Sequence, residues 1–128
     1  MDAGTAFLLK DKAVDGHLWV ILSDPKIDPT RVLFVSLTTY ADYKEDVCLI
    51  QVGEHPWVRH LTCVAYDFAK ITTVENLLAL KDKGFLELQP PMSTDLLKRI
   101  RQSAMASTRL AIDYYTILED HGLLEFDD

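Results

Sequence analysis

The chain is poor in cysteine and has no long apolar segment. Only two cysteines, Cys48 and Cys63, occur among its 128 residues, and both lie within apolar runs. We therefore expect two reduced core residues in a cytoplasmic protein, and no disulfide framework. No apolar run approaches the roughly 20 residues that a membrane-spanning helix needs, so no membrane partner is expected. An acidic residue precedes the first short apolar run, which is the wrong order for a secretory signal.

Glycine is also scarce, and its five copies are scattered along the chain. No glycine-rich loop that could cradle a phosphate is present, and no serine stands in a nucleophile elbow. Three imidazoles, those of His17, His55 and His60, would suit zinc if they came together. Their spacing matches no local zinc motif, and the cysteines fall on core positions. We therefore expect neither a metal nor a cofactor.

Positive charge is in short supply. The chain has 13 lysines and arginines against 20 aspartates and glutamates, a formal net charge of −7. A protein that binds nucleic acid indiscriminately usually has a broad basic face, and this balance argues against one. The acids gather in DYKED at 42–46 and in LEDHGLLEFDD at the end, however. A local positive patch around Arg59 and His60 is therefore compatible with the overall charge.

The pattern of apolar residues predicts one α+β domain over residues 1–128. Short runs rich in β-branched and aromatic residues, separated by breaks such as SDPKIDPTR, indicate strands. The expected strands are 6–9, 18–22, 32–37, 47–52, 61–66 and 85–89, and the expected helices are 74–80 and about 93–118. Sheet edges must close or be covered. We therefore expect a small barrel over about residues 4–90, with a short helix and then one long C-terminal helix.

Two stretches resemble a known family. GHLWVILSDP at 16–25 and VLFVSLTT at 32–39 resemble the core strands of the MazF/PemK-like toxins of toxin–antitoxin systems. Residues 20–23 match the end of the family's first core strand, and Thr38 with Thr39 matches its threonine pair. The resemblance implies an SH3-like barrel, a homodimer, a cognate antitoxin as protein partner, and cleavage of an RNA substrate.

The sequence also departs from that family. The position of the family's arginine is taken by His17, and that of its proline by Leu18. The loop after the first strand, residues 10–16, is short, although in the family this loop helps to contact RNA and antitoxin. If the family's chemistry is retained, another residue must do the work of the arginine.

Metal-independent RNA cleavage by the 2′-hydroxyl needs a base, an acid for the leaving 5′-oxygen, and a donor or cation for the phosphoryl oxygens. Imidazole exchanges protons near neutral pH, and the planar guanidinium matches phosphate oxygens. We therefore assign the roles of base and acid to His17 and His60, in either order. Arg59 and the hydroxyl of Thr38 are assigned to the phosphate.

The stretch HPWVRHLTCVAY, residues 55–66, supplies further candidates. His55, Trp57 and Tyr66 are expected to bind substrate, and Tyr66 shares a face with His60 because the two are an even number of strand steps apart. Each candidate also has a structural interpretation. The His-Pro pair could order a turn, Trp57 could cover the core, and Tyr66 suits a core position.

These residues support two hypotheses from different classes. The first is a toxin-like endoribonuclease, in which His17, Thr38, Arg59 and His60 converge in one concave site. The second is a non-catalytic barrel that binds a protein partner, such as an antitoxin-like peptide in a groove or along a strand edge. The missing arginine, the short loop and the acidic charge favour the second hypothesis. We adopt the first, because the polar residues cluster near the places where the resemblance puts a site.

Overall fold

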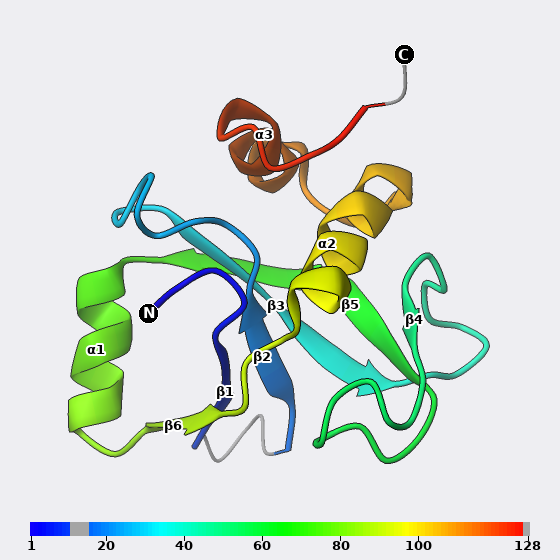
Figure 1. Ribbon diagram of the computed structural model, residues 1–128, viewed down its shortest axis with the longest axis horizontal. Coiled ribbons are helices and arrows are strands. Elements are labelled where there is room, and N and C mark those ends of the chain that lie inside the picture. Colours follow the sequence, from blue (N-terminus) through cyan, green and yellow to red (C-terminus); the bar gives the residue numbers. More distant parts are fainter. Residues whose placement is uncertain (11–15, 127–128) are drawn as a thin grey trace.

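The structure is a computed structural model that describes residues 1–10 and 16–126 (Figure 1). Within these residues, a six-stranded antiparallel sheet curls into a half-barrel, and three α-helices surround it. The strands are β1 (Ala6–Leu9), β2 (Leu18–Ile21), β3 (Val32–Thr39), β4 (Leu49–Ile50), β5 (Thr62–Thr72) and β6 (Leu86–Gln89). The helices are α1 (Val74–Asp82), α2 (Thr94–Ser103) and α3 (Ile112–Asp120). The predicted α+β class is confirmed, and no helix in this part of the chain is long and apolar enough to cross a bilayer.

The strands lie in the order β4-β5-β3-β2-β1-β6. Five of the six expected strands agree with the structure to within two residues at each end, and β1 agrees fully. The fourth strand was expected over 47–52, but only two of those residues are in β4. The fifth was expected to end at residue 66, but β5 continues to Thr72. The expected short loop at 10–16 lies mostly outside the described residues.

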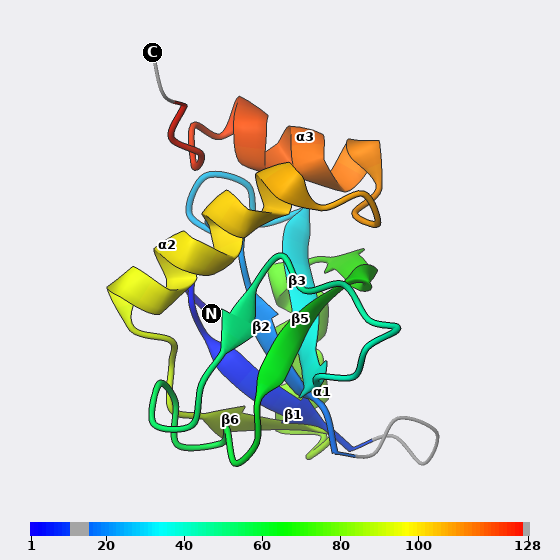
Figure 2. The ribbon, with the colours of Figure 1, turned by 90° about the vertical axis from the view of Figure 1, so that its right-hand side faces the viewer.

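Both faces of the central strands are buried. In β2, Leu18 and Val20 belong to an inner core beneath α2 and α3, whereas Trp19 and Ile21 belong to an outer core beneath α1. Successive side chains of a strand point to opposite faces, so a strand that is covered on both sides must be apolar throughout. The run LWVI satisfies this requirement. Figures 1 and 2 show α1 on one side of the sheet, with α2 and α3 on the other.

A large bulge interrupts the pairing of β5 with β3. Ser36 and Phe34 lie two residues apart in β3, but their partners, Ala65 and Lys70, lie five residues apart in β5. Val35 therefore faces four residues of β5. An insertion of this kind bends the strand and breaks the alternation of its side chains between the two faces. Two consecutive residues of the insertion are consequently both exposed.

The expected single helix over about residues 93–118 is wrong. Its start is as predicted, because the Oγ of Ser93 caps α2 by accepting the N–H of Leu96 at 3.1 Å. The helix ends at Ser103, however, and a 3₁₀ turn (Ala104–Ala106) and an extended segment precede α3. The C-terminal part is thus two short helices joined by a connection.

Ser107 explains the break. Its ψ of 133° is extended, and its hydroxyl accepts the backbone N–H groups two and three residues further on, at 3.1 Å each. The same hydroxyl donates to Glu45 at 2.6 Å, and Glu45 also accepts the N–H of Thr108 at 3.0 Å. A serine that bonds its neighbouring backbone competes with the helical hydrogen bonds. Because Glu45 lies far away in the sequence, this interaction cannot be read from helical periodicity.

We expect Ser107→Ala to lower the free energy of unfolding by about 1–2 kcal/mol, because it removes the acceptor of two backbone N–H groups and a donor to Glu45. Thr108→Ala is the matched control, since Thr108 is exposed and takes part in this connection through its backbone N–H. Urea unfolding followed by circular dichroism measures both variants. Equal stability of the two variants would contradict this account of the helix break.

Candidate functional site

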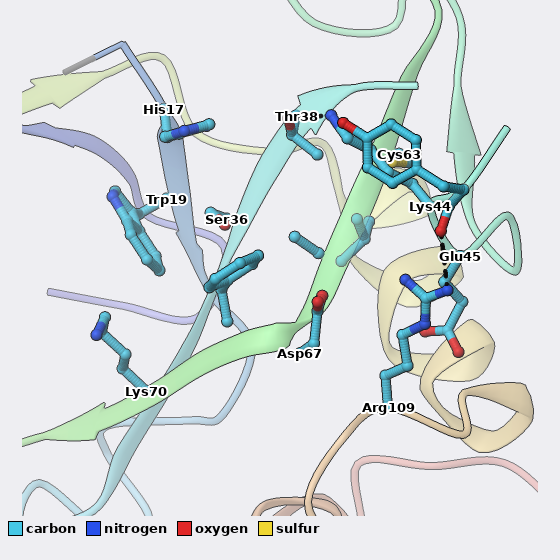
Figure 3. A pocket seen from close by; sticks show the side chains of 14 residues that line it. His17, Trp19, Ser36, Thr38, Lys44, Glu45, Cys63, Asp67, Lys70 and Arg109 are labelled. Carbon is cyan, nitrogen blue, oxygen red and sulfur yellow. Dashed lines mark hydrogen bonds between the residues drawn. The ribbon is translucent and has the colours of Figure 1, made fainter. Parts of the chain in front are cut away.

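A groove of about 580 Å³ opens on the outer face of the sheet, beside the part that α1 covers (Figure 3). It is formed by side chains from β2, β3 and β5, from the β3–β4 connection, and from the connection that precedes α3. These residues are His17, Trp19, Ser36, Thr38, Tyr43, Lys44, Glu45, Cys63, Val64, Ala65, Asp67, Phe68, Lys70 and Arg109. We call this hollow the groove.

Small side chains make the floor of the groove. Trp19 pairs with Ser36, and Ser36 pairs with Ala65, so a large residue is followed by two small ones in a row across three strands. Thr38 and Cys63 form the next row towards the end of the sheet. The short side chains leave space that longer ones would fill, and this space is the groove.

The bulge of β5 builds one wall. Because it breaks the alternation of side chains, the consecutive residues Asp67 and Phe68 both line the groove, and Lys70 follows them. Phe68 is 63% exposed, which is unusual for a phenylalanine next to a covered sheet face. The bulge thus presents an aromatic ring, a carboxylate and an ammonium group on one side of the cavity.

The β3–β4 connection and Arg109 build the opposite wall, which Figure 3 shows across the floor from His17, Trp19 and Lys70. Lys44 is held by two hydrogen bonds from its Nζ, one to Thr38 Oγ1 at 3.0 Å and one to the carbonyl of Thr39 at 2.7 Å. Arg109 donates from Nη2 to the carbonyl of Tyr43 at 3.1 Å. Tyr43 is 76% exposed.

Cationic groups surround the floor without carboxylate partners. In the described part of the chain, the ion pairs are Lys10–Glu87, Lys98–Glu125 and Arg99–Glu54. Lys44, Lys70 and Arg109 are therefore left with no carboxylate within 4.0 Å there. Glu45 and Asp67 line the same groove, so the three cations exceed the carboxylates by one formal charge. In a protein of net charge −7, even this small local excess of positive charge favours an anionic ligand.

The thiol of Cys63 lies at the floor but is not suited to act as a nucleophile. Cys63 is 1% exposed. Burial raises the pKa of the Cys63 thiol, although the nearby charge of Lys44 acts in the opposite direction. A thiol with a raised pKa is largely protonated at neutral pH and is a poor nucleophile. Cys48 is buried and free as well, as the sequence predicts.

Two of the residues predicted to be catalytic lie in the groove. Nδ1 of His17 is 3.4 Å from the carbonyl oxygen of Leu37. An imidazole that donates through Nδ1 keeps its lone pair on Nε2, and that nitrogen can accept a proton. Thr38 accepts a hydrogen bond from Lys44, so its own hydroxyl hydrogen remains to be donated to a ligand.

The other predicted residues do not join them. Arg59, His60 and Trp57 line a different cavity, which we call the second hollow. The expected convergence of four catalytic residues in one site is therefore wrong. Its cause is the geometry of the sheet end, where His60 precedes β5 and lies off the face that carries His17 and Thr38.

His55 and Tyr66 are buried structural residues. His55 is 3% exposed, and its Nδ1 accepts the N–H of Trp57 at 3.1 Å. Its Nε2 must therefore carry the proton that bonds to the carbonyl of Pro90 at 2.6 Å. The hydroxyl of Tyr66 donates to the carbonyl of Ile100 at 2.5 Å, and burial raises the pKa of that hydroxyl. Their expected role in substrate binding is not supported. The structural interpretations are supported instead: His55 orders a turn, and Tyr66 occupies a core position.

Several groove residues were not predicted from the sequence: Trp19, Tyr43, Lys44, Asp67, Phe68, Lys70 and Arg109. The segment DYKED was interpreted as an acidic cluster, so the positions of its tyrosine and lysine were overlooked. The one available signal was a tyrosine–lysine pair directly after the threonines of β3. Asp67 and Phe68 could not be found by alternation, because the bulge interrupts it.

No protein-family model, no curated protein and no solved structure matched the chain. Among the described residues, no group of three or more His, Cys, Asp or Glu side chains could hold a metal ion. Function is therefore inferred from the groove and its side chains.

We expect Tyr66→Phe to lower the free energy of unfolding by about 1 kcal/mol, because it removes a buried hydrogen bond between α2 and the sheet. Ligand binding in the groove should not change, since the ring of Tyr66 lies in the inner core. Thermal and urea unfolding measure the loss, with Tyr43→Phe as the exposed control. A variant of unchanged stability that loses binding would show that Tyr66 belongs to the site.

Proposed function

We propose that the groove binds a single strand of RNA, and that the protein is a toxin-like endoribonuclease that needs no metal. The observation that carries the proposal is the presence of His17, Thr38 and Lys44 in one groove with the exposed aromatic ring of Phe68. An imidazole, a hydroxyl and an ammonium group are the types of side chain that phosphodiester cleavage requires. In the resemblance to MazF/PemK-like toxins, His17 stands at the position of the family's arginine, and Thr38 matches a threonine of the family.

The walls of the groove suit a single strand. Proteins that bind single-stranded nucleic acid combine a cationic channel with aromatic side chains on which bases stack. Tyr43 and Phe68 are largely exposed and are available for stacking. Lys44, Lys70 and Arg109 are available for the phosphates. A duplex is a poorer fit, because the stacking surfaces of its bases are already occupied.

The proposed reaction is attack of a 2′-hydroxyl on the adjacent phosphate. His17 takes the hydroxyl proton on Nε2, and the freed oxygen forms a bond to phosphorus. The hydroxyl of Thr38 and the ammonium of Lys44 stabilise the charge on the phosphoryl oxygens. The bond from phosphorus to the 5′-oxygen breaks, and Lys44 gives that oxygen a proton. The products are a 2′,3′-cyclic phosphate and a 5′-hydroxyl.

The same groove also favours a second function. Its floor is mostly apolar, its rim carries three cations and two carboxylates, and it contains one imidazole where two were expected. An acidic peptide with apolar side chains would fit such a surface, as in the non-catalytic binding hypothesis. The antitoxin partner and the homodimer remain proposals that rest on the resemblance.

We expect wild-type protein to cleave a mixed RNA pool in EDTA and to leave cyclic phosphate ends. His17→Ala should slow single-turnover cleavage roughly 10²–10⁴-fold, the usual contribution of a positioned base. Lys44→Ala should slow it about 10²-fold or more, because it removes a charge at the phosphate and the proton donor for the leaving 5′-oxygen. His60→Ala should slow it far less than His17→Ala, because His60 lies outside the groove.

Lys26→Ala is the matched control for the lysine variant, because Lys26 is exposed in the β2–β3 loop. Circular dichroism checks that each variant is folded. If folded wild-type protein neither cleaves nor binds RNA at any pH from mildly acidic to mildly basic, the endoribonuclease proposal is wrong. Saturable binding of a labelled peptide that alternates leucine and glutamate would then support the second function.

A further inference from the structure

The second hollow lies at the same end of the sheet as the groove. Its volume is about 590 Å³. Its lining comes from the end of β3, the start of β5, the loop between β4 and β5, and the end of β6. These residues are Gly16, Thr39, Pro56, Trp57, Arg59, His60, Thr62, Gln89 and Pro90.

The two hollows adjoin each other across the sheet. Three pairs of consecutive residues contribute one member to the groove and the other to the second hollow, namely His17 with Gly16, Thr38 with Thr39, and Cys63 with Thr62. Consecutive Cα atoms are only 3.8 Å apart, and in the two pairs that lie within β3 and β5, successive side chains point to opposite faces. The hollows therefore lie on the two sides of one sheet margin.

Lys44 connects the hollows chemically. Its Nζ donates to the side chain of Thr38, which lines the groove, and to the carbonyl of Thr39, which lines the second hollow. The ammonium group of Lys44 is thus held within hydrogen-bond distance of one residue from each hollow.

The second hollow has an aromatic residue, Trp57, whose backbone is held in place. The backbone N–H of Trp57 donates to His55, and His55 in turn donates to Pro90. Trp57 also packs against the inner core. His55, which was expected to bind substrate, thus positions the backbone of Trp57. Because the indole is also packed against the core, it loses little freedom when a base stacks on it.

We propose that the second hollow is a second subsite for the same RNA strand. Arg59 binds the phosphate that follows the one held in the groove, and Trp57 stacks the base of that nucleotide. Arg59 and His60 are exposed and available to a phosphate, and the guanidinium fork matches phosphate oxygens. This inference rests on the proposed function, and it adds a requirement for a strand long enough to reach both hollows.

The test compares a trinucleotide with a dodecanucleotide, because single-strand sites take on the order of 4–16 nucleotides. Both are fluorescently labelled 2′-O-methyl RNA, which lacks the attacking hydroxyl and leaves the wild-type protein usable. Binding is measured by fluorescence anisotropy for wild type, Arg59→Ala in the second hollow, Lys70→Ala in the groove, and Arg31→Ala. Arg31 is the matched control, because it is exposed and precedes the opposite end of β3.

We expect Arg59→Ala to weaken dodecanucleotide binding about tenfold and to leave trinucleotide binding unchanged. The slope of log affinity against log salt should fall by about 0.7, the value for one phosphate contact on a single strand. Lys70→Ala should weaken the binding of both oligonucleotides. The chain has two tryptophans, Trp19 and Trp57. The part of the quenching of tryptophan fluorescence that only the dodecanucleotide produces should therefore disappear in Trp57→Phe.

The possible failures are distinguishable. If Arg59→Ala matches Arg31→Ala on the dodecanucleotide while Lys70→Ala weakens both, the second subsite is wrong and the proposed function stands. Equal weakening of both oligonucleotides by Arg59→Ala also contradicts a separate subsite. If wild type binds neither oligonucleotide, or if no variant binds more weakly than Arg31→Ala, the proposed RNA binding fails and the second subsite fails with it.

Discussion

The rest of the structure depends on the burial of the central strands on both faces. The inner face is covered by α2 and α3, which pack on it through residues such as Ile100 and Leu118. On the outer face, Leu77 of α1 packs with Val32 and Phe34 in the first half of β3. Ser36 and Thr38, further along β3, have no helix over them and line the groove instead. The groove is that uncovered part.

What occupies the open part follows from local pairing. A strand face left bare would ordinarily carry polar residues, and here it carries small ones, with Ser36 and Ala65 side by side. The bulge of β5 then directs both Asp67 and Phe68 to the edge of the groove. The opposite wall depends on Glu45, which anchors the connection after α2 through Ser107 and Thr108. The broken C-terminal helix and the groove are therefore linked, because one carboxylate holds the connection from which Arg109 reaches the β3–β4 loop.

The sequence predicts those parts of the fold that depend on near neighbours. Apolar runs such as LWVI identify the strands, and Ser93 identifies the start of α2, because burial and capping leave short-range patterns. The break at Ser107 depends on Glu45, which lies 62 residues away, and the role of His55 depends on Pro90, which lies 35 residues away. The same limit applies to the site. His17 and Thr38 were found through the resemblance to the toxin family, whereas the separation of His60 required knowledge of how the chain enters β5.

The separation of the histidines also changes the chemistry that the groove could perform. A single imidazole can take the proton of the attacking hydroxyl, but it cannot at the same time protonate the leaving oxygen. The second proton must come from another group, and Lys44 is the ammonium that is already held against Thr38 and Thr39. Its two acceptors are neutral oxygens, so no carboxylate has to be displaced before a phosphate can bind. The same arrangement suits a ligand that is only bound, because the cation attracts it and the apolar floor receives it. Whether the groove cleaves or only binds therefore depends on the proton donor, since the cations and the floor would serve both functions equally well.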